Sequence, residues 1–173
     1  WGVTYANGLW VTVGQGGNTV AYSSDGISWT PGTGNVFTGA GQGVAYANGL
    51  WVAVGGGGNA IITSTNGISW TGRTGMTIFS TTGFGVAYGN GLWVAVGNGT
   101  NSFATSVDGI SWVGRGQTIF SINGYGVTYA NNLWVAAGQG GNSMASSVDG
   151  ITWTGRSGTT VFANYAYGVA HNG

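Results

Sequence analysis

The sequence predicts an all-β protein, a β-propeller built from four-stranded antiparallel blades. Three observations support this prediction: a repeat of about 41 to 42 residues, tight-turn dipeptides between short apolar runs, and the absence of a helical apolar period. A four-stranded unit that recurs at this interval has the length of one propeller blade.

A four-residue phrase marks the start of each repeat. Gly-Val-(Ala/Thr)-Tyr begins at Gly2, Gly43, Gly85 and Gly126, and it returns in altered form at Gly168. The intervals are 41, 42, 41 and 42 residues. We therefore expect one domain over residues 1–173, with four full repeats at 2–42, 43–84, 85–125 and 126–167, and a partial fifth repeat, one extra strand, at 168–173.

The second repeat illustrates the four strands that we expect in each blade. Runs 43–47 and 50–54 flank Asn48-Gly49, a dipeptide that favours a type I′ hairpin because both turn positions need positive φ. A glycine-rich loop leads to a third run at 60–64, and a second tight turn leads to a fourth at 68–71. The equivalents of the first turn are Asn7-Gly8, Asn90-Gly91 and Asn131-Asn132.

Both faces of the second strand are apolar. In the second repeat, Leu50, Val52 and Val54 share one face, and Trp51 and Ala53 share the other. A strand that is apolar on both faces is expected to be covered on both. We therefore expect each blade to lie between two neighbours, with an indole filling the hollow of the adjacent blade.

The second turn of each repeat carries a motif. The segment from Ser23 to Trp29 resembles the Asp-box of the sialidase-type (BNR) β-propellers, a Ser/Thr-x-Asp-x-Gly-x-x-Trp turn, with one residue fewer between Asp and Trp. Whole repeats also resemble the Trp- and Gly-rich propeller repeats of uncharacterised bacterial, phage and large-DNA-virus proteins. The resemblance covers essentially the whole chain and implies a structural turn at four positions: Asp25, Asn66, Asp108 and Asp149.

The residues argue against a sialidase-like active site. That resemblance would imply an arginine triad, a tyrosine nucleophile with a glutamate partner and an aspartic acid/base, yet the chain has no glutamate. Arg73, Arg115 and Arg156 are equivalent in successive repeats, so we expect them to radiate rather than converge. Paired carboxylates of glycosidases lie roughly 5 to 10 Å apart, and one aspartate per blade does not provide that. We expect no enzymatic activity, no catalytic residue and no cofactor.

The composition excludes several other kinds of site. Only six of the 173 residues are charged, with a formal charge of zero and neither lysine nor cysteine. A nucleic-acid groove needs clustered Lys and Arg, and a cysteine zinc site needs thiolates. His171, the single histidine, has no metal partner of its kind, so we expect no metal site. No apolar run approaches the roughly 18 residues of a membrane helix, so we expect no membrane insertion.

Aromatic residues are the candidate ligand-binding residues of this sequence. Trp1, Phe84, Tyr125 and Tyr167 each immediately precede a predicted first strand, and Gln42 is the exception. Neutral aromatic surfaces beside amides and hydroxyls suit uncharged sugars. We expect four equivalent weak sites, which would bind a multivalent glycan by avidity.

One substitution pattern suggests a pairing between repeats. Gly32 stands in place of the arginine in the first repeat, and Asn66 in place of the aspartate in the second. If each arginine bound the aspartate of the following repeat, Gly32 and Asn66 would occupy the two positions of a single pair. Both charged partners of that pair would then be absent together. The hypothesis predicts two contacts, Arg73–Asp108 and Arg115–Asp149.

These observations favour a non-enzymatic structural or scaffolding β-propeller, extracellular, on a cell surface or on a virion. The alternative is a multivalent lectin-like module that binds neutral glycans through the repeated aromatic residues. The chain has five copies of the first strand and four of the others, so closure by the last copy, a continuing array and assembly of several copies all stay open. A continuing or assembling array is slightly favoured, with the chain itself as partner.

Overall fold

Four antiparallel meanders of short strands make up the structure, a computed structural model that describes residues 1–34, 36–73, 77–156 and 162–170. The first contains β1 (Val3–Ala6), β2 (Leu9–Val13), β3 (Val20–Ser23) and β4 (Thr30–Pro31). The second contains β6 (Gly41–Ala47), β7 (Leu50–Gly55), β8 (Ile61–Ser64) and β9 (Ser69–Gly72), and β5 (Thr33–Gly34) pairs in parallel with β9. The third contains β10 (Thr82–Gly89), β11 (Leu92–Asn98), β12 (Phe103–Ser106) and β13 (Val113–Gly114). The fourth contains β14 (Asn123–Ala130), β15 (Leu133–Gln139), β16 (Met144–Ser147) and β17 (Thr154–Gly155).

The described residues form no helix, so the all-β prediction is confirmed. It follows that none of them belongs to a helix that could cross a membrane. The first hairpin turns also have the predicted geometry: φ is positive at both central positions, for example 51° at Asn48 and 77° at Gly49. Asn131 and Asn132, at 50° and 58°, show that a second asparagine can replace the glycine.

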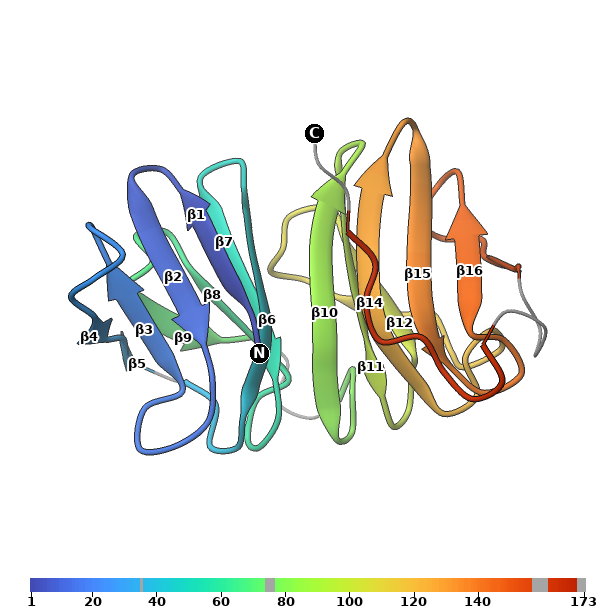
Figure 1. Ribbon diagram of the computed structural model, residues 1–173, viewed down its shortest axis with the longest axis horizontal. Coiled ribbons are helices and arrows are strands. Elements are labelled where there is room, and N and C mark those ends of the chain that lie inside the picture. Colours follow the sequence, from blue (N-terminus) through green and yellow to red (C-terminus); the bar gives the residue numbers. More distant parts are fainter. Residues whose placement is uncertain (35, 74–76, 157–161, 171–173) are drawn as a thin grey trace.

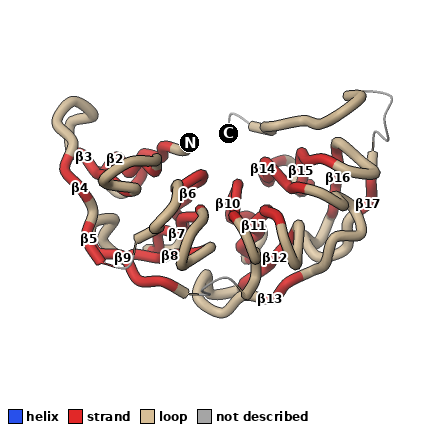
Figure 2. Tube along the Cα trace, turned by 90° about the horizontal axis from the view of Figure 1, so that it is seen from below, coloured by secondary structure: helices blue, strands red, loops and turns tan. Residues whose placement is uncertain are grey.

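The meanders follow one another around an arc in the order of the sequence (Figures 1 and 2). In Figure 2, β6, β10 and β14 lie on the inner side of the arc, and β9, β13 and β17 lie at its rim. The N-terminus and the last described segment border the open side. The described residues therefore form an open arc and not a closed ring.

The hydrophobic core lies in three layers, one between each pair of neighbouring meanders. In the middle layer, Trp93 of β11 packs in one cluster with Val52 and Val54 of β7. The second-strand tryptophans of the three layers, Trp51, Trp93 and Trp134, are all buried. The prediction that an indole fills the space beside the preceding blade is confirmed. Trp10, with no described meander before it, is only half-buried.

A β-bulge interrupts the first strands of the second, third and fourth meanders. In each strand the register with its neighbour shifts across a Gly-x-Gly triplet, at residues 41–43, 83–85 and 124–126. The two glycines pack against the meanders on either side: a Cβ on Gly83 would lie 2.9 Å from Cβ of Val54, and one on Gly85 would lie 3.0 Å from the carbonyl oxygen of Tyr125. A bulge re-aims the residue that it carries, so the middle residue is turned out of the packed layers.

The segment from Tyr165 to Ala170 lies beside β14 in the place of a further first strand. The backbone N–H of Ala166 donates to the carbonyl of Gly138 at 3.1 Å. A Cβ on Gly126 would lie 3.2 Å from Cα of Gly168, the same close approach that joins the earlier first strands. The partial fifth repeat therefore begins as a neighbour of the fourth.

Candidate functional site

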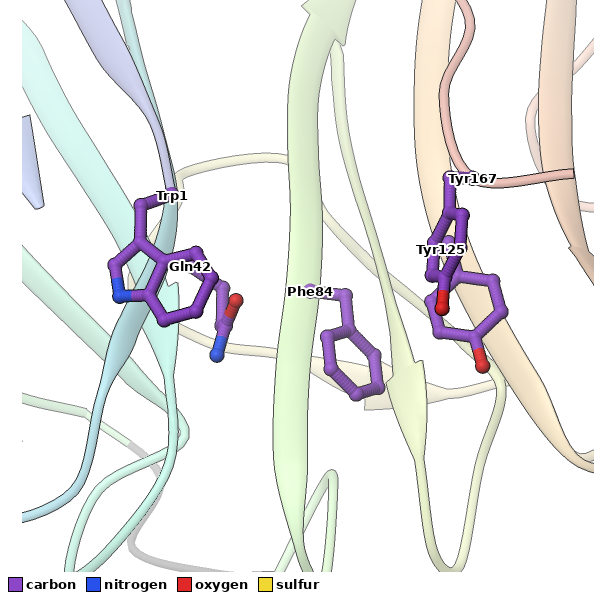
Figure 3. A pocket seen from close by; sticks show the side chains of 5 residues that line it. All are labelled: Trp1, Gln42, Phe84, Tyr125 and Tyr167. Carbon is purple, nitrogen blue, oxygen red and sulfur yellow. The ribbon is translucent and has the colours of Figure 1, made fainter. Parts of the chain in front are cut away.

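Five positions that are equivalent in the repeat meet at one pocket on the inner side of the arc (Figure 3). The pocket has a volume of about 300 Å³ and is lined by Trp1, Gln42, Phe84, Tyr125 and Tyr167. In Figure 3, Trp1 and Gln42 lie on one side, Tyr125 and Tyr167 on the other, and Phe84 between them. The structure thus brings together the four aromatic residues expected from the sequence and the glutamine that breaks their pattern.

The bulges explain how these side chains reach the pocket. Gln42, Phe84 and Tyr125 are the middle residues of the three Gly-x-Gly triplets. The expectation that they precede the first strands is wrong, because β6, β10 and β14 each begin one or two residues earlier. The glycine on each side was the signal that sequence reasoning missed, since an isolated glycine within a strand pattern indicates a bulge.

The tyrosines and Phe84 form a continuous wall. The ring centroids of Phe84 and Tyr125 are 5.2 Å apart, and those of Tyr125 and Tyr167 are 4.7 Å apart. Tyr165 extends the wall behind Tyr167, with centroids 4.7 Å apart and an edge-on geometry. Tilted and edge-on contacts of this kind are the favoured geometry of aromatic pairs.

A side-chain network holds Tyr125 in place. The Nδ2 atom of Asn123 donates to the Tyr125 hydroxyl at 2.8 Å, and the hydroxyl donates to Oε1 of Gln139 at 2.9 Å. Asn123 also donates to the same Gln139 oxygen at 3.1 Å, which closes the network. The orientation of the Tyr125 ring is therefore fixed by the two strands that carry these partners, β14 and β15.

The side chains that line the pocket are neutral. The Gln42 amide is half-buried and forms no hydrogen bond with any described residue. The neighbouring Tyr165 raises the pKa of Tyr167 above its ordinary value, so this phenol stays neutral at physiological pH. Trp1 and Tyr167 are 72% and 66% exposed, an unusual state for such large apolar side chains.

The arrangement corrects the expectation of four separate, equivalent sites. Because the first strands all lie on the inner side of the arc, residues about 41 to 42 positions apart in sequence become neighbours in space. The aromatic residues share one pocket, so several rings can contact a single ligand. Avidity between distant sites is not what this geometry offers.

The four predicted turn residues act as local hydrogen-bond acceptors. Oδ1 of Asp25 accepts from the backbone N–H groups of Ile27 and Ser28, both at 2.8 Å, and from the Ser23 hydroxyl at 2.8 Å. The amide oxygen of Asn66 accepts the two equivalent backbone bonds at 2.9 Å. The same pattern recurs at the two remaining turns, those of Asp108 and Asp149.

These hydrogen bonds lower the pKa values of the aspartates. The backbone N–H groups of Ser28 and Ile27 lower the pKa of Asp25 to about 2. Those of Ser111 and Ile110 lower the pKa of Asp108 to about 2 in the same way. Asp149 is shifted in the same direction by its own turn. A general acid at neutral pH needs a raised pKa, so these carboxylates are suited to holding turns and not to donating protons.

The Arg–Asp pairs suggested by the sequence are not formed. Nε of Arg73 donates to Oγ1 of Thr63 at 2.6 Å, and Nε of Arg115 donates to Oγ1 of Thr105 at 2.9 Å. Arg156 likewise binds a hydroxyl ten residues earlier. The aspartates are engaged in turns that precede the fourth strands, whereas the arginines follow those strands. The pairing hypothesis is therefore wrong.

No group of three or more His, Cys, Asp or Glu side chains in the described part of the chain could hold a metal ion. His171, considered above as a metal ligand and set aside, lies outside the described residues.

At the end of the arc, the face that is buried between meanders elsewhere is only partly covered, with Val135 and Met144 half-buried and Ala137 buried. In the third layer, Val94, Val96 and Phe103 pack with Trp134. The described residues form no further meander against their counterparts one repeat later, Val135, Ala137 and Met144. A hollow of about 330 Å³ lies on this face, lined by Leu133, Val135, Met144, Ala145, Ser146 and Arg156.

Internal layers show what fills the equivalent hollow. A Cβ on Gly109, in the turn of the third repeat, would lie 2.6 Å from the Leu50 side chain and 3.3 Å from that of Val52. Leu133 and Val135 are the counterparts of these two residues in the fourth repeat. The hollow beside them therefore corresponds to the place of a further turn.

Comparisons with known proteins bear on the fold alone. No protein-family model matches the sequence, and no curated protein matches it either. Among solved structures, the computationally designed protein Ika8 matches with a TM-score of 0.69 and 10% identity, over 99% of this chain and 52% of that one. YCF48 from Cyanidioschyzon merolae matches with a TM-score of 0.61 and 17% identity, over 90% and 55% of the two chains. A structural genomics protein of unknown function from Bacteroides thetaiotaomicron matches with a TM-score of 0.63 and 17% identity, over 92% and 44%.

The fold is β-propeller-like, as these structural matches and the meanders show together. The chain spans about half the length of the three matched structures. The matches do not identify the Asp-box family to which the turn motif is similar.

Proposed function

We propose that the chain is a non-enzymatic structural module whose outer faces pack against further blades of the same repeat. The observation that carries this proposal is the difference between the filled layers and the partly uncovered end face. Each layer between meanders buries apolar residues from both sides, whereas the Val135 face ends in a hollow. A partly uncovered apolar face of this kind favours association.

The two ends of the arc are complementary. The face of the first meander carries Trp10, the counterpart of the buried Trp51, and the face of the fourth carries Val135. Contact between the two would repeat the existing layers. Because the two faces differ, the contact is heterologous, and it either closes a ring or extends a filament. The greater length of the three structures reported above leaves room for further blades of this kind.

The placement of the charged residues supports a role without catalysis. The aspartates lie in separate turns as hydrogen-bond acceptors, and the arginines bind hydroxyls of their own repeats. No two carboxylates are brought together for acid–base chemistry of the kind used in glycoside hydrolysis.

Mass measurement over a range of concentrations tests the proposal. Light scattering coupled to size-exclusion chromatography should show self-association of the wild type. Val135→Asp places a charge in the contact and should leave a monomer, because a buried unpaired charge is strongly disfavoured. Val107→Asp is the matched control, since Val107 is 77% exposed, belongs to the third repeat and lines no hollow at this end of the arc. A wild type that stays monomeric at all concentrations, or an assembly unaffected by Val135→Asp, would contradict the proposal.

A further inference from the structure

We infer that the pocket lined by Trp1, Gln42, Phe84, Tyr125 and Tyr167 binds one neutral pyranose unit of a saccharide. Its volume of about 300 Å³ is at the small end of the range for ligand pockets. This role differs from the packing of blades, and it requires Tyr165–Ala170 to stay beside β14, because Tyr167 lines the pocket.

The residues of the pocket are not required by the fold. Each bulge needs its two glycines because they touch the neighbouring meanders, but the middle residue faces away from those contacts. Gln42 shows that a polar residue is accepted at this position. The aromatic residues at the other four positions therefore need a different explanation, above all Trp1 and Tyr167, whose rings are largely exposed.

The wall of rings suits the flat face of a sugar. Phe84, Tyr125 and Tyr167 contact one another in series, with centroids 5.2 Å and 4.7 Å apart. The faces of aromatic rings carry partial negative charge, which attracts the polarised C–H groups on one face of a pyranose. The hydrogen bonds of the Tyr125 hydroxyl hold the middle ring before a ligand arrives, and such preorganisation lowers the entropic cost of binding.

Gln42 supplies polar recognition on the opposite side. A glutamine amide has two N–H donors and a carbonyl acceptor, and none of them has a described partner in this structure. Sugar hydroxyls both donate and accept, so one hydroxyl pair can satisfy this amide. Figure 3 shows Gln42 across the pocket from the tyrosines, which places stacking and hydrogen bonding on different sides of a ligand.

The same geometry disfavours charged ligands. No cationic side chain lines the pocket, so a phosphate or carboxylate would lose water without gaining a charged side chain as partner. A quaternary ammonium group prefers rings that surround it, whereas these rings touch one another along a wall, and none of the lining residues carries a carboxylate. Neutral sugars fit both the apolar wall and the uncharged amide.

Saturation-transfer NMR with the full chain tests the inference. The probes are the methyl glycosides of glucose, galactose, mannose and N-acetylglucosamine, with choline and glucose 6-phosphate as charged comparisons. We expect at least one methyl glycoside to bind with a dissociation constant of about 1 mM. Saturation should be strongest on the C–H protons of one ring face. Choline and the phosphorylated sugar should give no signal above background.

Three substitutions locate the site. Tyr167→Ala and Gln42→Ala should each weaken binding about ten-fold without changing the melting temperature, because neither side chain is part of the buried core. Tyr5→Ala is the matched control: Tyr5 is also a largely exposed tyrosine, at 56%, but it does not line the pocket. Tyr125→Phe removes only the hydroxyl network and should weaken binding less than Tyr167→Ala.

Several outcomes would overturn the inference: no methyl glycoside binds, choline or the phosphorylated sugar binds more tightly, or Tyr167→Ala and Gln42→Ala leave binding unchanged. Repeating the titration on Val135→Asp separates this inference from the structural role. Sugar binding by a monomeric variant supports the pocket even where assembly fails.

Discussion

A Cβ atom on Gly43 would lie 2.9 Å from the carbonyl oxygen of Phe84. The first strands of the second and third meanders therefore approach each other more closely than any residue with a side chain would permit. The same approach recurs between the later first strands, where a Cβ on Gly126 would lie 3.2 Å from Cα of Gly168. The phrase that opens each repeat begins with glycine for this reason.

Gly43→Ala should lower the free energy of unfolding by about 1–3 kcal/mol, the usual effect of adding a methyl group to a packed interior. Gly17→Ala is the control, because a Cβ on Gly17 would meet nothing within 4 Å and its φ lies outside the left-handed region; its effect should stay within about 0.5 kcal/mol. Urea denaturation of both variants measures the difference. Equal stability of the two would show that the strands do not approach as described.

Acid should destabilise the protein between about pH 4 and pH 2. The pKa values of Asp25 and Asp108 are lowered to about 2 in the folded chain, from an ordinary value of 3.8. Their ionised forms therefore stabilise the fold above the ordinary value, and this contribution is lost as pH falls through the folded values. Melting temperatures recorded from pH 6 to pH 2 should show the decline.

Asn66 indicates how to remove that acid sensitivity. Its amide oxygen accepts the same two backbone hydrogen bonds without titrating. Replacing all three aspartates, by Asp25→Asn, Asp108→Asn and Asp149→Asn, should therefore preserve the fold at neutral pH. It should also reduce the decline in melting temperature below pH 4. An unchanged decline in this triple variant would assign the acid effect to other groups.

Arg115 and Asp149 should contribute independently. Arg115 binds Thr105 in its own repeat, and Asp149 binds the backbone of its own turn. In a double-mutant cycle with Arg115→Gln and Asp149→Asn, the two changes in melting temperature should add. A marked departure from additivity would restore the inter-repeat pair that the structure disfavours.

Removing residues 165–173 should strengthen self-association. Tyr165–Ala170 lies where the first strand of an incoming blade would lie, and β1 of a second copy needs that place. The backbone of the segment is joined to the fourth meander through the bridge between Gln139 and Tyr165, which includes the bond from Ala166 to Gly138, and two of its rings contact Tyr125. By contrast, β1 of an incoming copy is already paired with β2 along four register positions. We therefore expect β1 of a second copy to displace the C-terminal segment. Sedimentation velocity of the truncated and full chains compares their association, and weaker association after truncation would show that the segment itself joins the copies.

Local signals in the sequence predicted the meanders well. Between two apolar runs, Asn48-Gly49 strongly favours a type I′ hairpin turn. The structure has the positive φ that this turn needs at both positions. The alternation of Trp51 with Val52 predicted packing on both faces, because a sheet cannot leave either apolar face in water. In both cases the information lies within a few neighbouring residues.

Features that depend on residues far apart in the chain were harder to predict from the sequence. The pocket required knowing that the inner strands converge, which no single repeat reveals, and that Phe84 sits on a bulge between two glycines. The predicted Arg73–Asp108 pair does not form because the guanidinium of Arg73 already donates a hydrogen bond to Thr63 in its own repeat. A charged side chain can be satisfied by a neutral hydroxyl and need not pair with another charge. Correlated substitutions in two repeats were a weaker guide than the hydrogen bonds available nearby.

The three core layers also set the order in which the molecule opens. The core layers join neighbouring meanders, so the resistance of a meander to local unfolding depends on how many layers it shares. The second and third meanders each belong to two layers, and the first and fourth to one. Transient opening, and with it amide exchange and proteolytic cleavage, should therefore begin at both ends of the arc and reach β7 and β11 last.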